Sequence, residues 1–111
     1  MAPNEKTFGG AISDARKAKG WALKDLAAKV LREDEEPISP QYLNDIEHDR
    51  RSPSSDRMVQ QFVEALGINR DWLYYLAGRL PDDVRDRLSE KQVTEGMVAF
   101  RREITKGGKG R

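Results

Sequence analysis

The sequence of 111 residues contains no cysteine and a single histidine, His48. Disulfide scaffolds, cysteine-based zinc sites and thiol catalysis are therefore excluded, and a metal cage built from histidines cannot form. A catalytic triad would have to use His48, but no serine or acidic residue stands at the motif spacing of a partner. We therefore interpret His48 as a surface or capping histidine, and we expect a protein that is not an enzyme and has no metal and no cofactor.

Long hydrophobic runs are also absent. No stretch approaches the roughly 20 apolar residues that span a bilayer, and the mean hydropathy is -0.81. No apolar block follows a basic N-terminus either, so no secretory signal is visible. The sequence thus predicts a cytoplasmic protein with no membrane partner.

Charge of one sign does not dominate, because 20 Lys and Arg residues balance 19 Asp and Glu residues. The total alone does not indicate a nucleic-acid binder. Local placement is uneven, since residues 1–30 and 101–111 are net basic, at +3 and +4, whereas residues 32–36 are net acidic, at -3. Basic ends therefore flank an acidic segment, although each run taken alone is equally consistent with a solvated surface of mixed sign.

Apolar residues recur at helical spacing, and no stretch alternates for long as a strand would. Five short helices are expected before Gly78. Their inward-facing residues are, in turn, Phe8, Ile12 and Ala15; Leu23, Leu26, Ala27 and Val30; Leu43 and Ile46; Met58, Val59, Phe62 and Leu66; and Trp72, Leu73 and Leu76. Because the connections are short, the pattern predicts a compact all-α domain.

Capping residues predict where three of these helices begin. Ser39 caps the third helix and Pro40 occupies its first position, where a missing N–H is tolerated. Ser54 is expected to cap the fourth helix and Asn69 the fifth. A glycine follows each of the last two helices and is expected to end it.

Residues 79–105 are expected to form a helical extension. A short helix begins at Pro81, and a longer one follows Ser89, which has capping-box spacing to Gln92. The longer helix carries one apolar seam, formed by Val93, Met97, Phe100 and Ile104. The seam packs either on its own domain or against a second chain. We favour a second chain, because five helices close a core without it.

The last residues, 106–111, have no apolar anchor and are expected to be a disordered basic tail. The expected organisation is therefore a domain over 1–78, a helical extension over 79–105 that is a candidate dimerisation element, and this tail.

The third expected helix exposes a narrow polar face once Leu43 and Ile46 are buried. That face carries Pro40, Gln41, Asn44 and Asp45. It suits a DNA major groove, where Gln and Asn pair bidentately with adenine and a carboxylate accepts from cytosine. Candidate phosphate contacts lie near the start of the second helix and just past the third, at Lys24, Arg50 and Arg51.

Six sequence elements also occur together in a fixed order. They are Arg16-Lys17-Ala18-Lys19-Gly20-Trp21, Leu26-Ala27-Ala28-Lys29, Ile38-Ser39-Pro40-Gln41-Tyr42-Leu43-Asn44-Asp45-Ile46-Glu47, Arg50-Arg51-Ser52-Pro53-Ser54, Ala65-Leu66-Gly67-Ile68 and Asp71-Trp72-Leu73. With these elements, residues 8–78 resemble the Xre-type, phage-repressor-like helix-turn-helix domain. The resemblance implies a five-helix domain that binds operator DNA, usually as a homodimer.

The resemblance also implies roles for individual residues. An Arg of the first helix pairs with a Glu at the end of the recognition helix in such domains, and these positions are Arg16 and Glu47, a structural pair outside the base-reading set. Family base contacts map onto Pro40, Gln41 and Asp45, with Ser39, Tyr42 and Asn44 beside them. Lys24, Arg50 and Arg51 complete the expected DNA-binding set.

Three departures from the family pattern stand out. Residues 31–37 replace a turn of a few residues, and they either extend the second helix or form a small flap. Their carboxylates are expected to point away from DNA, because they would repel phosphates. Leu23 stands where a phosphate-binding Gln is common, so that contact is lost or moves to Lys24. The third helix and its exit carry Asp45, Glu47 and Asp49, which is acidic for a segment that contacts DNA. Glu47 is explained by its pairing with Arg16, and Asp45 either reads cytosine or is solvated.

Two other groups have a functional and a plainer interpretation. Acidic residues 33–36 lack the spaced pattern of a calcium loop and are interpreted as a solvated loop. Trp72, Tyr74 and Tyr75 are interpreted as core and interface residues rather than as a stacking platform for single strands.

The sequence therefore predicts a DNA-binding transcriptional regulator of the nucleoid, a repressor that binds a palindromic operator as a homodimer. The alternative is an antitoxin or adaptor in which residues 79–111 bind a partner protein.

Overall fold

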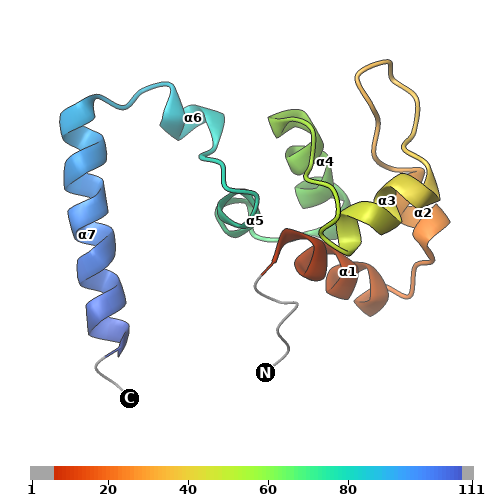
Figure 1. The fold of residues 1–111 in the computed structure, drawn as a ribbon, viewed down its shortest axis with the longest axis horizontal. Coiled ribbons are helices and arrows are strands. Elements are labelled where there is room, and N and C mark those ends of the chain that lie inside the picture. Colours follow the sequence, from red (N-terminus) through yellow and green to blue (C-terminus); the bar gives the residue numbers. More distant parts are fainter. Residues whose placement is uncertain (1–6, 109–111) are drawn as a thin grey trace. The chain divides into compact units, whose positions relative to one another are not determined.

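The computed structural model describes residues 7–108. They contain the helices α1 (Phe8–Ala18), α2 (Leu23–Ala27), α3 (Pro40–Glu47), α4 (Asp56–Leu66), α5 (Arg70–Leu76), α6 (Asp82–Arg85) and α7 (Glu90–Gly108), shown in Figure 1. Over this range no strand forms, and Leu31 and Pro37 make a single isolated bridge. The predicted all-α class is confirmed.

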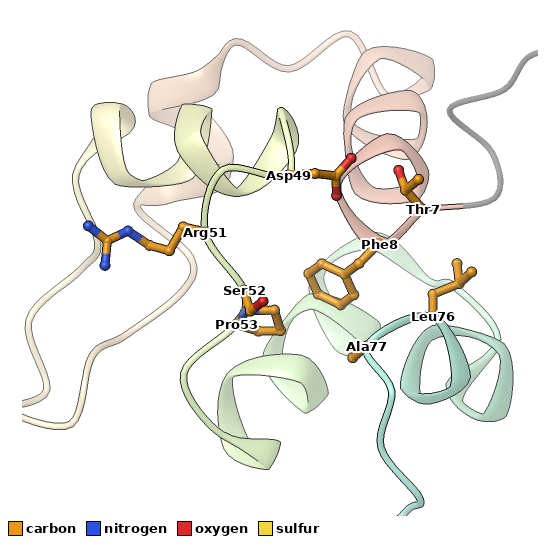
Figure 2. Close-up of a pocket in the computed structure, with 8 residues that line it drawn as sticks. All are labelled: Thr7, Phe8, Asp49, Arg51, Ser52, Pro53, Leu76 and Ala77. Carbon is orange, nitrogen blue, oxygen red and sulfur yellow. The ribbon is translucent and has the colours of Figure 1, made fainter.

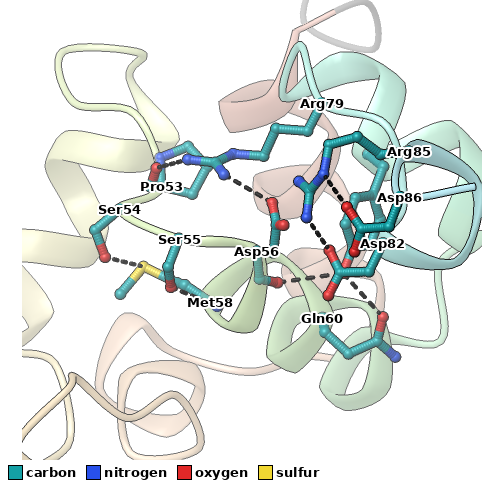
Figure 3. A network of polar contacts seen from close by, with 11 residues as sticks. Pro53, Ser54, Ser55, Asp56, Met58, Gln60, Arg79, Asp82, Arg85 and Asp86 are labelled. Atoms are coloured by element: carbon teal, nitrogen blue, oxygen red, sulfur yellow. Dashed lines mark hydrogen bonds and ion pairs between the residues drawn. The ribbon is translucent and has the colours of Figure 1, made fainter.

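The chain forms two compact units, residues 1–81 and 82–111. The first unit contains α1 to α5, and the second contains α6 and α7. The division falls after Pro81 rather than at the expected position after Gly78. The reason is that Arg79 is bound to Asp56 of α4, with 2.7 Å between Nη1 and Oδ1 (Figure 3), and that Pro81 is buried.

The core of the first unit combines apolar residues from all five helices and from the chain around α2. Phe8 of α1 and Phe62 of α4 meet edge to face, with ring centroids 5.7 Å apart. The other buried members are Ile12, Leu26, Ala27, Val30, Ile38, Leu43, Ile46, Met58, Val59, Leu66, Leu73 and Tyr74. The apolar face of α3 is therefore sealed, and its remaining residues are left for other contacts.

The start of α1 is packed tightly against the end of α3. Thr7 caps α1 by accepting the N–H of Gly10 at 2.9 Å, and Asp49 accepts the N–H of Gly9 at 3.0 Å. A Cβ atom at Gly9 would collide with the carbonyl oxygens of Ile46 and Glu47. Glycine at this position thus sets how closely the two helices approach.

The helix caps follow the expectation at α3 and α5 but not at α4. Ser39 accepts the N–H of Tyr42 at 3.0 Å, and Asn69 accepts the N–H of Trp72 at 2.9 Å. Ser55, not Ser54, caps α4, because the helix starts one residue later than expected. Figure 3 shows the hydroxyl of Ser54 turned to the sulfur of Met58 instead.

The expectation that Trp72 faces the core is wrong. Its side chain is 46% exposed and stacks on Tyr75 with centroids 5.5 Å apart, while Tyr74 is 3% exposed. Successive residues of a helix are about 100° apart, so α5 cannot turn Trp72 inward together with Leu73 and Tyr74. The hydroxyl of Tyr74 reaches the carbonyl of Asp56 at 3.2 Å, which satisfies its polar end.

Residues 31–37 form a flap and do not extend α2. The chain doubles back through the bridge between Leu31 and Pro37, and Glu35 at its tip has a φ of 70°. The side-chain amide of Gln61 on α4 accepts the N–H of Leu31 at 2.7 Å and donates to its carbonyl at 3.1 Å. Arg57 adds an ion pair to Glu35 at 3.0 Å. The flap, which projects beyond α2 and α3 in Figure 1, is thereby fastened to α4.

The second unit begins with α6, where Arg85 pairs with Asp82 at 3.0 Å and with Asp86 at 3.1 Å (Figure 3). Ser89 and Gln92 form the expected reciprocal cap of α7, at 2.9 and 3.2 Å.

The expected disordered tail, residues 106–111, overlaps the end of α7. This helix continues to Gly108, and residues 109–111 lie outside the described residues. In the part of the chain that the structure describes, no helix combines the length and apolarity of a membrane crossing.

Candidate nucleic-acid interface

The polar face of α3 is open on the surface of the first unit. Ser39, Pro40 and Gln41 are exposed, and Tyr42, Asn44 and Asp45 are half-buried. Leu43 and Ile46 on the opposite face are fully buried. The expected base-contacting residues therefore lie on the solvent-facing side of α3, and one of them, Tyr42, also packs against the core.

Arg16 and Glu47 hold α3 in place against α1. Nε of Arg16 donates to Oε2 of Glu47 at 2.7 Å, and Nη2 donates to Oε1 at 2.9 Å. The remaining Nη1 donates to the carbonyl of Trp21 at 2.7 Å, so the turn after α1 is tied in as well. The side-chain hydrogen bonds that Arg16 donates to Glu47 raise the pKa of Arg16 above its ordinary value, against the effect of burial. This bidentate pair fixes both distance and angle between the helices.

Gln41, Asp45 and Arg50 form a second polar network, on the open face itself. Oδ1 of Asp45 accepts from Nε2 of Gln41 at 3.1 Å. The same oxygen accepts from Nε and Nη2 of Arg50, at 3.2 and 2.9 Å. The sequence placed these three residues in the DNA-binding set but did not indicate that they are bonded to one another.

Arg51 stacks on Tyr42, with its guanidinium carbon 4.5 Å from the ring centroid. Such a cation–π contact orients a guanidinium while leaving its N–H groups available. Arg51 is exposed and has no ion pair among residues 7–108. Its charge is therefore available to an external anion at the edge of the α3 face.

Lys24 stands apart from these residues, exposed in the first turn of α2. Lys19 and Lys29 form a basic cluster at Trp21 that the sequence did not indicate. The ammonium groups of Lys19 and Lys29 lie 5.3 and 5.0 Å from the ring centroid of Trp21. The two lysines are ten positions apart, so only the turn around Trp21 brings them together. In the sequence, the one sign of this cluster is that a lysine stands on each side of the tryptophan.

A cavity of about 370 Å³ lies between α1, the loop after α3 and the end of α5 (Figure 2). Phe8 and Pro53 contribute to its wall. The carboxylate of Asp49 points toward the start of α1, where it binds Gly9, and the side chain of Arg51 points away from the cavity. No cluster of three potential metal ligands occurs within residues 7–108. Among the expected DNA-binding residues, Arg51 alone lines this cavity, and the others lie outside it.

His48 is exposed and follows the last residue of α3, as expected for a surface or capping histidine. Its Nδ1 lies 2.9 Å from the carbonyl of Asn44.

Comparison with known protein families matches the chain to the family described as "Helix-turn-helix", over residues 12–73. The matched segment covers more than half of the chain and runs from α1 into α5. Comparisons with curated proteins and with solved structures found no match. The order of the helices in the chain and the open polar face of α3 agree with the family match. The chain belongs to the Xre, phage-repressor-like family of helix-turn-helix DNA-binding regulators.

Proposed function

We propose that the protein is a repressor that binds a palindromic operator in double-stranded DNA as a homodimer. The observation that carries the proposal is the exposed polar face of α3, braced from behind by Arg16 and Glu47. A helix presented in this way fits the major groove, whose edge pattern distinguishes all four base pairs. Bound at its operator, the protein would exclude polymerase sterically.

Base contacts are assigned to the first turns of α3. Gln41 offers an amide to adenine, and such a bidentate pair is worth about 1–3 kcal/mol of discrimination. Asn44 carries the same chemistry one turn further. Ser39, Pro40, Tyr42 and Asp45 complete the face that meets the groove.

Phosphate contacts are assigned to three exposed cations. Arg50 and Arg51 follow the end of α3, and Lys24 lies in the first turn of α2. These contacts set affinity and register but do not read sequence. Their strength is expected to fall with salt, because each one releases counterions from DNA.

The homodimer is assigned to the extension. Val93, Met97, Phe100 and Ile104 recur at steps of four and three along α7 and are between 40% and 64% exposed. A second copy of the same seam would cover them, as in a coiled coil. In the homodimer on DNA, the two α3 helices would enter successive major grooves, about 34 Å apart.

A second candidate function rests on the same exposed seam. If α7 binds a different protein, the chain is an antitoxin or adaptor and its DNA contacts are secondary. The mass of the purified protein separates the two, because a repressor dimer forms without a partner.

The proposed function is tested by selecting bound duplexes from a random DNA library at fixed salt. We expect a palindromic consensus with two half-sites one helical turn apart. The control is Gln41→Ala, which should select the same half-sites but accept several bases at one position. Recovery of unenriched DNA by the wild-type protein would contradict the proposal.

A further inference from the structure

The Asp45 carboxylate lies between the side chains of Gln41 and Arg50, two of the expected DNA-binding residues. Gln41 is one turn before it in α3, at the i, i+4 spacing that brings side chains together on a helix. Arg50 reaches it from beyond the C-terminal end of the helix. All three hydrogen bonds end on Oδ1, between 2.9 and 3.2 Å, and the Asp45 side chain is 25% exposed. One oxygen thus sets the position of both neighbours.

The bond to Asp45 decides how the Gln41 amide faces outward. A glutamine amide has two N–H donors and one carbonyl acceptor. When Nε2 is turned toward Asp45, a rotation by half a turn would replace the hydrogen bond with a repulsion between two oxygens. The second N–H and the carbonyl oxygen then remain for an external partner. Adenine requires that pair, one donor to N7 and one acceptor for its amino group.

The bond to Asp45 also acts on Arg50. Two of its N–H groups are occupied by the carboxylate, whose negative charge offsets the guanidinium charge. Arg50 therefore has fewer N–H groups and less net positive charge with which to bind a phosphate than an unpaired arginine has. Asp45 itself repels phosphates, so its charge opposes binding to any DNA sequence.

We propose that Asp45 is a positioning residue for specificity: it holds the Gln41 amide in the orientation that reads adenine and restrains Arg50, which lowers affinity for random DNA. This inference rests on the proposed function. It differs from the two roles considered for Asp45 from the sequence, reading cytosine and being solvated.

The decisive comparison is between Asp45→Ala and Asp45→Asn in site selection and in competition against random duplexes. Asp45→Ala removes the acceptor, so the preference at the base pair read by Gln41 should fall about fivefold or more, the lower end of a bidentate contact. Asp45→Asn keeps an amide oxygen that can accept from Gln41, so most of the preference should remain. Both variants lose a negative charge, and both should bind random duplexes more tightly, with a salt dependence steeper by about one unit.

The double variant Gln41→Ala/Asp45→Ala tests the coupling. In the Gln41→Ala background, Asp45→Ala should change base preference no further, because there is no amide left to orient. If Asp45→Ala instead abolishes a preference for cytosine at a second position in both backgrounds, Asp45 reads a base and the inference is wrong. An unchanged preference in Asp45→Ala also overturns it. Melting curves of each variant confirm that the fold is intact.

A measurement on the free protein keeps this inference separate from the proposed function. In NMR spectra, the Nε2 protons of Gln41 should differ from those of the exposed Gln92 and should return toward them in Asp45→Ala. If the wild-type Gln41 protons already match those of Gln92, the inference fails even where a DNA consensus is found. If the protons shift as expected but no duplex is enriched, the proposed function fails and Asp45 orients Gln41 toward another ligand.

Discussion

Arg16 and Glu47 are 31 positions apart, yet they form two parallel hydrogen bonds of 2.7 and 2.9 Å between α1 and α3. Both residues are largely buried, at 9% and 7% exposure. The pair aligns the recognition helix without using any group of its open face. Since a buried charge depends on its partner, the pair also predicts how the fold responds when one charge is removed.

Removing the carboxylate of Glu47 should destabilise the first unit strongly. Glu47→Ala leaves the Arg16 guanidinium buried without its counter-charge, which costs about 3–5 kcal/mol. Urea unfolding followed by circular dichroism measures the loss. Glu64→Ala, on the exposed side of α4, is the control and should change the free energy of unfolding by less than about 0.5 kcal/mol. Equal effects of the two variants would show that the pair does not hold the helices together.

Gly9→Ala should also destabilise the first unit, because the added methyl group meets the carbonyl oxygens of Ile46 and Glu47. Overpacking of this kind costs about 1–3 kcal/mol, and the thermal midpoint should fall accordingly. The control is Gly96→Ala in α7, where a Cβ atom meets nothing within 4 Å. That change should raise helix content, since Ala is favoured over Gly by about 1 kcal/mol. A thermal midpoint unchanged by Gly9→Ala would mean that α1 and α3 can separate at little cost.

Arg51→Ala should weaken specific and random DNA binding alike. Its guanidinium is presented by Tyr42 and has no ion pair within residues 7–108, so its loss should flatten the salt dependence by about one unit. Binding curves at several salt concentrations measure the slope. Arg87→Ala removes an equal charge from the second unit and should leave the slope nearly unchanged. If Arg51→Ala alters base preference instead, Arg51 contacts a base.

Truncation after Pro81 should leave a folded monomer. The cut retains Arg79, which is bound to Asp56, and it removes α6 and the seam of α7. Light scattering should give the mass of one chain for the truncated protein and of two for the full chain. Phe100→Glu in the full chain is the matched variant, because one charge in the seam should also dissociate the dimer. A full chain that is already monomeric would favour the partner-protein candidate.

Much of the fold could be predicted because its signals are local. Apolar spacing placed the helices, and Ser39 and Asn69 marked two starts correctly. Ser54 and Ser55 are adjacent and chemically equivalent as caps, so only the path of the chain decides between them. The apolar pattern of Trp72, Leu73 and Leu76 predicts that all three face the core, but a seven-residue helix has room for only part of its aromatic residues on one face.

The candidate site could be predicted in its residue set but not in its internal bonds. The polar face of α3 follows from helical periodicity once Leu43 and Ile46 are assigned to the core. The approach of Arg50 to Asp45 does not follow from helical periodicity, because it depends on the turn after α3, where Asp49 has a φ of 59°. A positive φ at a residue other than glycine is rare and has no strong sequence signal.

The flap at residues 31–37 makes the length of the connection between α2 and α3 independent of how the two helices are placed. A short turn would couple the two. Val30 and Ile38, at the base of the flap, are joined by a backbone hydrogen bond of 2.9 Å, and both are buried. The relative placement of α2 and α3 is therefore set beneath the flap, whatever the length of chain above it. We therefore expect this part of the molecule to accept inserted residues, such as an epitope or a fluorophore attachment site, without a change in the orientation of α3.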